Sequence, residues 1–240
     1  MYVENNSLKM GLRDGAVIGL GYLAASFAFG ILAVSSGMTA LQALLISMLN
    51  LTSAGQFAAL PIIGGAGSLV ELGLTQLVIN SRYSLMSISL SQKLGRSVKF
   101  SDRLFIGFSN TDEIFAFSME KEGYVGRNYM IGIILPAYFG WTLGTLLGAV
   151  AGNLLPAVVT TALSVGMYAM FIALLVPAAR KSMPTMLCIL CAIALSCAFY
   201  YIKALSVVPS GFVIIIVAVS VSALFSLLFP IEDEEQEVEE

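Results

Sequence analysis

The chain carries no charged side chain between Asp14 and Glu71. Because about 20 residues of helix span a bilayer, this stretch must hold more than one membrane element. The whole chain is 58% hydrophobic and 11% charged, with a mean hydropathy of +0.90, which is typical of an integral membrane protein. We therefore predict an all-α, polytopic transmembrane helix bundle of about six to eight membrane segments.

Charges and helix-breaking residues divide the chain into three parts. Residues 1–14 form a short N-terminal segment, and residues 15–230 form a single transmembrane domain. Seven of the last nine residues are acidic, so residues 231–240 are expected to be a disordered acidic tail. Within the domain the apolar runs are listed in chain order: Gly15–Val34, Leu41–Leu60, Leu69–Leu90, Leu104–Ser118, Asn128–Ala179 (divided at Asn153 and Pro156), Thr185–Tyr200 and Val207–Phe229.

Two of these runs contain polar residues near their middle. Leu41–Leu60 carries a cluster from Asn50 to Gln56 and meets Pro61, which predicts an interrupted helix. Leu104–Ser118 carries the adjacent carboxylates Asp112 and Glu113. A carboxylate at bilayer depth costs roughly 2.5–3.5 kcal/mol, so such residues usually face a protein interior or a watery cavity. Interrupted backbone is tolerated at that depth only where it is buried in protein or lines a cavity.

The charges of the loops decide between two topologies. If every run is a full span, the basic loop from Lys93 to Arg103 lies outside, against the preference of positive loops for the cytoplasm. If Leu41–Leu60 and Leu104–Ser118 each enter and leave on one side, that loop lies in the cytoplasm. The second version brings two broken segments to the midplane from opposite faces, an inverted plan that recurs in secondary transporters. Both versions place the N- and C-termini in the cytoplasm.

Three polar clusters are candidates for function. The first is Ser53-Ala54-Gly55-Gln56-Phe57, and the second joins Asn80, Arg82 and Ser84. The third is Thr111-Asp112-Glu113. Asp112 and Glu113 diverge by about 100° on a helix, so one can exchange protons while the other pairs with Arg82, and either assignment fits the sequence. The alternative role of these side chains is hydrogen bonding between helices.

The regularly spaced glycines and the paired cysteines are interpreted as packing features. Gly132, Gly140, Gly144, Gly148 and Gly152, with Pro136, fall every four residues and predict a ridge for close helix packing. The Cys188-x-x-Cys191 pair lies in an apolar run and is interpreted as core. The chain has no histidine that could complete a metal site with these cysteines. No cofactor is expected.

The polar clusters, taken in order, resemble those of a known family. The segments are listed in chain order: Phe29-Gly30, Ser53-Ala54-Gly55-Gln56-Phe57-Ala58-Ala59, Asn80-x-Arg82-Tyr83, Thr111-Asp112-Glu113-x-Phe115-Ala116 and Tyr138-x-x-Trp141. Together they resemble the AzlC family, the large subunits of branched-chain amino acid exporters, over residues 15–152. Tyr83, in place of a histidine, and Asn50-Leu51-Thr52 depart from the family's pattern.

The resemblance implies the function that we expect. The chain would export leucine, isoleucine and valine across the cell membrane, driven by protons, together with a small AzlD-like hydrophobic membrane subunit. Ser53, Gly55, Gln56, Asn80, Arg82 and Asn110 would bind substrate, and Asp112 and Glu113 would couple protons. A nucleic-acid partner is not expected. The alternatives are an intramembrane enzyme such as a lipid phosphatase, disfavoured by the few basic residues at membrane depth, and a structural membrane subunit.

Overall fold

The computed structural model describes residues 3–154, 182–205 and 207–229, together with residues 158, 172, 175, 176, 179 and 180. The helix expected between Pro156 and Ala179 falls largely outside the described residues, and the acidic tail 231–240 lies wholly outside them.

The described part of the chain is nearly all helical, which confirms the predicted class. Its helices are α1 (Leu8–Ser35), α2 (Ala40–Leu49), α3 (Ala54–Gly64), α4 (Leu69–Lys93), α5 (Phe100–Phe108), α6 (Asp112–Met119), α7 (Arg127–Leu154), α9 (Met183–Tyr201) and α10 (Ser210–Leu228). Two short strands, β1 (Glu4–Asn5) and β2 (Tyr124–Val125), pair in parallel and were not predicted.

Helices α1 and α7 run parallel and touch along most of their length. A Cβ added at Gly11 would lie 2.3 Å from Tyr129 O, and one added at Gly148 would lie 2.0 Å from Phe27 O. Contacts this short show that backbone meets backbone, which only glycine permits. The ridge predicted on residues 132–152 is confirmed, and its partner is the glycine-rich face of α1.

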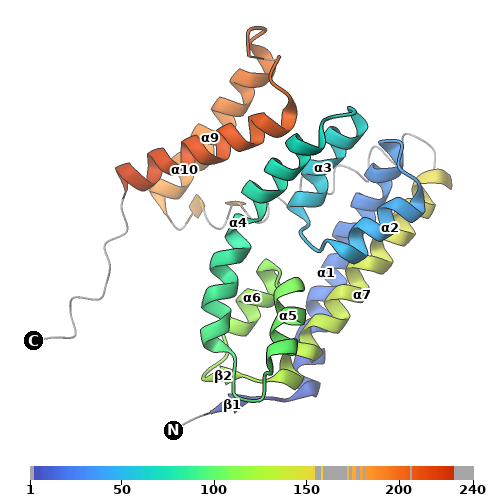
Figure 1. The fold of residues 1–240 in the computed structure, drawn as a ribbon, viewed down its shortest axis with the longest axis vertical. Coiled ribbons are helices and arrows are strands. Elements are labelled where there is room, and N and C mark those ends of the chain that lie inside the picture. Colours follow the sequence, from blue (N-terminus) through green and yellow to red (C-terminus); the bar gives the residue numbers. More distant parts are fainter. Residues whose placement is uncertain are drawn as a thin grey trace, which may run out of the picture.

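The first broken run folds back on itself as a hairpin. The Thr39 hydroxyl accepts a hydrogen bond from Gln42 N and starts α2, which ends at Leu49. Helix α3 then returns to Gly64, where an added Cβ would lie 3.5 Å from Ser36 O. Both ends of the α2–α3 hairpin therefore lie at the same end of the molecule (Figure 1). The expected break lies at residues 50–53, but Pro61 lies inside α3, where its ring is exposed.

The second broken run forms a hairpin from the opposite end. Helix α5 stops at Phe108 and α6 starts at Asp112, so the predicted interruption lies at residues 109–111. The outer ends of this α5–α6 hairpin are held near the N-terminus by the β1–β2 pairing and a bridge between Leu94 and Val125. The chain thus follows the re-entrant alternative rather than eight full spans.

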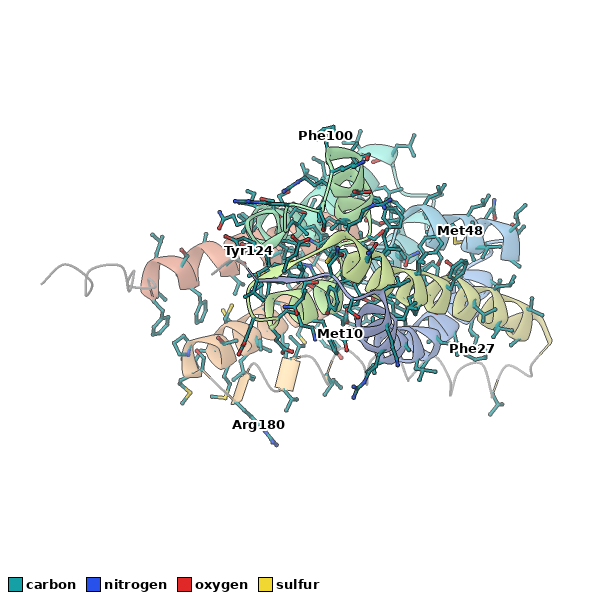
Figure 2. All side chains as sticks on the ribbon, turned by 90° about the horizontal axis from the view of Figure 1, so that it is seen from below. Met10, Phe27, Met48, Phe100, Tyr124 and Arg180 are labelled. Atoms are coloured by element: carbon teal, nitrogen blue, oxygen red, sulfur yellow. The ribbon has the colours of Figure 1, made fainter. Side chains whose placement is uncertain are left out.

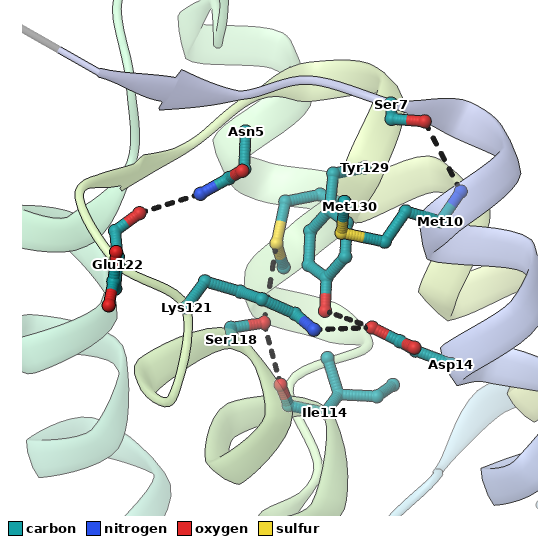
Figure 3. A network of polar contacts seen from close by, with 10 residues as sticks. All are labelled: Asn5, Ser7, Met10, Asp14, Ile114, Ser118, Lys121, Glu122, Tyr129 and Met130. Carbon is teal, nitrogen blue, oxygen red and sulfur yellow. Dashed lines mark hydrogen bonds and ion pairs between the residues drawn. The ribbon is translucent and has the colours of Figure 1, made fainter.

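Polar contacts fix this end of the molecule (Figure 3). Asp14 on α1 pairs with Lys121 at 2.7 Å and accepts a hydrogen bond from the Tyr129 hydroxyl at 3.0 Å. The Ser118 hydroxyl donates to Ile114 O at 2.7 Å within α6. The exit of the second hairpin is therefore joined to the N-terminal parts of α1 and α7.

The two hairpins make an inverted arrangement. Helix α1 precedes the first hairpin and helix α4 precedes the second, and the two hairpins enter from opposite ends (Figure 1). Each hairpin helix has 8 to 11 residues, about 12–16 Å of helix, so each tip reaches roughly halfway through a hydrocarbon core of about 30 Å.

Four described helices are long and apolar enough to cross a membrane: α1, α7, α9 and α10. Helices α9 and α10 lie to one side of the α1–α7 pair, which carries the labelled Met10 and Phe27 (Figure 2). Helix α9 contains no buried residue. Cys188 and Cys191 are only half-buried there, so the interpretation of this pair as core was wrong.

Candidate functional site

The two hairpin tips meet at a cavity of about 640 Å³. The first tip contributes Leu51, Ser53 and Ala54, and the second contributes Thr111, Asp112 and Glu113. The remaining wall comes mainly from α1, α4 and α7, with Phe117 of α6 and Leu175, and it includes Val17, Ile18, Tyr22, Arg82, Tyr83 and Trp141. Most of the wall is apolar, and its charged side chains among the described residues are Arg82, Asp112 and Glu113.

Arg82 and Asp112 form an ion pair on the cavity wall. Arg82 Nη2 lies 2.9 Å from Asp112 Oδ2, and the two side chains remain 44% and 42% exposed, so a ligand can reach both. The same nitrogen donates to the Tyr83 hydroxyl at 3.3 Å, and the guanidinium lies over the Tyr83 ring. Of the two carboxylates, Asp112 is therefore the one that pairs with Arg82, and Tyr83 steadies the arginine.

Glu113 points to a different helix. Its Oε2 accepts a hydrogen bond from the Tyr22 hydroxyl on α1. The Tyr22 oxygen also lies 2.6 Å from Thr111 Oγ1, which accepts from Ile114 N at 3.4 Å and so caps α6. The divergence expected for successive residues on a helix sends Asp112 toward α4 and Glu113 toward α1.

The first hairpin is fastened to its neighbours by neutral groups. Gln76 on α4 donates to Gly55 O at 2.8 Å, and Asn80 donates to Gln76 at 3.1 Å. A Cβ at Gly55 would lie 2.5 Å from Gln76 Oε1, so a side chain there would displace the Gln76 side chain that donates to Gly55 O. Gly55 and Asn80 are outside the set of residues that line the cavity.

Gln56 belongs to a buried chain that reaches α7. Its Nε2 donates to Ser47 Oγ at 3.1 Å, and Ser47 Oγ lies 2.7 Å from Thr145 Oγ1. These three side chains are at most 1% exposed. Gln56 therefore joins the two arms of the hairpin to the α1–α7 pair instead of lining the cavity.

Asn110 lies on the other side of the second tip. Its amide donates to Ser87 Oγ at 3.4 Å, beside a separate small cavity of about 90 Å³. The polar stripe of α4 thus faces both hairpins: Gln76 and Asn80 meet the first, and Ser87 meets the second. Of the six expected substrate-binding residues, Ser53 and Arg82 line the larger cavity.

Two aromatic residues of this site were not assigned from the sequence. Trp141 is 2% exposed, packs edge-on against Tyr22 with ring centroids 5.3 Å apart, and lines the cavity. Its Nε1 has no hydrogen-bond partner among the described residues. Trp141 belongs to the Tyr138-x-x-Trp141 segment of the family resemblance, but that segment gave it no role in a site. Tyr22 is a single aromatic residue in an apolar helix, and no sequence signal distinguishes its position from ordinary packing.

Two opposed re-entrant hairpins that meet at a charged cavity among long apolar helices define a membrane protein of the transporter type. Residues 17–155 match the AzlC protein family. This match covers more than half of the chain, so the protein belongs to the AzlC family, as the sequence motifs predict. Apart from Leu175, every lining residue of the cavity lies within the matched region.

The relatives are membrane proteins. The chain is 29% identical over 147 residues to the inner membrane protein YgaZ of Escherichia coli, covering 60% of each chain. It is 31% identical over 171 residues to an uncharacterized membrane protein of Archaeoglobus fulgidus, covering 70% of this chain and 74% of the relative. A Helicobacter pylori membrane protein is 29% identical over 138 residues, which are 56% of this chain and 59% of that protein. No solved structure matches the chain.

Proposed function

We propose that the protein exports hydrophobic amino acids such as leucine, isoleucine and valine across the cell membrane, coupled to protons. The observation that carries this proposal is the cavity between the hairpin tips. The cavity combines apolar walls with one positive and one negative side chain, Arg82 and Asp112, at the depth where the two half-membrane hairpins meet. A zwitterionic amino acid with an apolar side chain has the complementary distribution of charge and apolar surface.

The Arg82–Asp112 pair suits a zwitterion because each partner can be replaced by a substrate group of the same charge. The substrate carboxylate would take the place of Asp112 beside the guanidinium, and the substrate ammonium would take the place of Arg82 beside Asp112. A guanidinium binds a carboxylate through two parallel N–H donors. In the empty protein the two side chains neutralise each other, which limits the penalty of charge at membrane depth.

Ser53 lies at the N-terminus of α3 with no side-chain cap on that helix. The first N–H groups of a helix favour negative charge, so this tip offers a second contact for the substrate carboxylate. Gly55, Gln56, Asn80 and Asn110 hold the tips in place in this proposal, and Asp112 and Glu113 supply the proton-coupling groups.

Orientation and assembly belong to the same proposal. The end that carries Lys93, Arg96, Lys99 and Arg103 also carries the N-terminus, and because positive loops prefer the cytoplasm we expect the N-terminus to lie there. The C-terminus is expected on the same side. A small AzlD-like membrane subunit would complete the exporter. This expectation rests on family membership.

A phosphate-processing enzyme fits the cavity poorly. Arg82 is the one cation among the described lining residues, and it stands beside two carboxylates that would repel a phosphate. Belonging to a transporter-type family also favours transport over catalysis.

Flux measurements in proteoliposomes test the proposal. We expect efflux of labelled leucine, isoleucine, valine or methionine, accelerated by an imposed pH gradient, when the chain is reconstituted with its small subunit. Arg82→Gln should lower this efflux at least tenfold, whereas Arg103→Gln, a matched change beside the smaller cavity, should leave it within twofold. Absence of flux for all four amino acids would refute the proposal, and release of phosphate from lipid phosphates would support the enzyme alternative.

A further inference from the structure

Tyr22 joins one of the two carboxylates to the end of a helix. The phenol oxygen contacts Glu113 Oε2 and, at 2.6 Å, Thr111 Oγ1. Thr111 in turn accepts the N–H of Ile114 and caps α6. From this chain we infer that Glu113 is the residue that binds and releases the transported proton, and that Tyr22 is the positioning residue that transmits its charge to the second hairpin. This inference rests on the proposed export function.

The surroundings of the two carboxylates favour Glu113 over Asp112. Asp112 is already engaged in an ion pair with the Arg82 guanidinium at 2.9 Å. The hydrogen-bond donor that the structure gives Glu113 is a neutral phenol, which can serve either the ionised or the protonated carboxyl group. A proton can therefore enter and leave Glu113 without breaking an ion pair.

The charged and titratable groups that face Glu113 come from two elements besides its own. Helix α4 contributes Arg82 and Tyr83, both lining the same cavity, and α1 contributes Tyr22. Asp112 is its neighbour on α6, and α7 contributes the uncharged Trp141. Arg82 is already engaged by Asp112, so Tyr22 is the group that responds directly to a change of charge on Glu113.

Counting hydrogens shows how the response is transmitted. A phenol has one hydrogen, so Tyr22 cannot donate to Glu113 and to Thr111 together. When Glu113 is ionised, Tyr22 donates to it and accepts from the Thr111 hydroxyl. When a proton from water has added to Glu113, the carboxyl O–H donates to Tyr22, and Tyr22 donates to Thr111. Protonation thus reverses two hydrogen bonds while the heavy atoms stay in contact.

The reversal reaches the N-terminus of α6 in two ways. Thr111 Oγ1 changes from donor to acceptor toward Tyr22 while it also accepts the Ile114 N–H. Glu113 lies in the first turn of α6, where a negative charge stabilises the helix and a neutral carboxyl does not. The second hairpin is therefore held most firmly when Glu113 is ionised, which couples its position to the proton.

Infrared difference titration of the purified full-length protein tests the proton site without any substrate. We expect a protonated-carboxyl band that titrates with pH in the wild type, disappears in Glu113→Gln and persists in Asp112→Asn. A band that disappears in Asp112→Asn and persists in Glu113→Gln would overturn the assignment.

The role of Tyr22 is tested by the midpoint of the same band. Tyr22→Phe removes the donor to the ionised carboxylate, so the midpoint should move upward by about one pH unit. Tyr138→Phe is the matched control, because the Tyr138 hydroxyl donates to Met48 O outside the cavity. Thr111→Val provides a second test if Tyr22→Phe does not fold, and Thr111→Ser should retain the wild-type midpoint. A wild-type midpoint in both Tyr22→Phe and Thr111→Val would overturn the role of Tyr22.

Parallel flux measurements separate this inference from the proposed function. Titration of Glu113 in a protein that moves no amino acid would refute export and leave the proton site standing. Leucine efflux with wild-type pH dependence in Glu113→Gln would overturn the inference and leave export standing.

Discussion

Replacing Gly148 by alanine is expected to force α1 and α7 apart. The added Cβ would lie 2.0 Å from Phe27 O and within 2.9 Å of Phe27 C and Cα. Cβ atoms essentially never approach other heavy atoms closer than 3.0 Å, so the gap must open by at least 1.0 Å at this point. The obstacle is backbone, which cannot rotate away as a side chain can.

The expected loss of stability follows from the cost of overpacking. One extra methyl in a well-packed interior typically costs about 1–3 kcal/mol, and a backbone obstacle places Gly148→Ala at the upper end of that range. A glycine-to-alanine change in an unobstructed helix has the opposite sign, because alanine favours helix by up to about 1 kcal/mol. The sign of the effect therefore distinguishes the two situations.

Thermal unfolding of the purified protein in detergent measures this effect. The matched control is Gly73→Ala in α4, since a Cβ at Gly73 would meet nothing within 4 Å. We expect Gly148→Ala to melt at a lower temperature than the wild type and Gly73→Ala to melt at the same temperature or higher. Equal melting temperatures for the two variants would refute the close packing of α1 against α7.

Three further predictions concern single side chains. Glu71→Ala removes the acceptor of the Gly211 N–H, whose nitrogen lies 2.9 Å from Glu71 Oε1. The free energy of unfolding should fall by about 1–3 kcal/mol, and hydrogen exchange at the start of α10 should become faster. Unchanged exchange there would contradict this prediction. Ser47→Ala removes the hydroxyl that joins Gln56 to Thr145 on α7, and the free energy of unfolding should fall by a similar amount. An unchanged free energy of unfolding would show that these hydrogen bonds do not stabilise the fold. Hydrogen bonds from Lys99 N and the Arg127 side chain lower the pKa of Asp102. This carboxylate therefore stabilises the fold above pH of about 4 and stops doing so as the pH falls through its lowered pKa, so Asp102→Asn should flatten the decline of the melting temperature below that pH.

The interruptions of both hairpins could be predicted because they depend on local chemistry. Polar side chains from Asn50 to Gln56 and the carboxylates at 112 and 113 cannot sit in a continuous lipid-facing helix. The direction of each hairpin followed from the basic residues between Lys93 and Arg103. The prediction failed for Pro61, because a single missing N–H inside a short helix is tolerated when the ring faces outward.

The contacts between distant segments were not predictable from one sequence. Tyr22 and Glu113 are joined only because α1 and α6 pack together, and nothing near Tyr22 in the chain indicates this. The same holds for Ser47 and Thr145, two small polar residues in apolar helices. The β1–β2 pairing was also missed, since strands of two residues have no detectable alternation.

The pairing of α1 with α7 has a consequence for biosynthesis. Phe27 and Gly148 touch across about 120 positions of the chain, which a ribosome adds in roughly 6–24 s at 5–20 residues per second. Throughout that interval the glycine face of α1 is in the membrane without the partner that it fits. Nascent α1 must therefore be shielded by lipid or by the insertion machinery until residues 127–154 emerge. Truncations that end before α7 should be cleared by membrane proteases more quickly than truncations that end just after it.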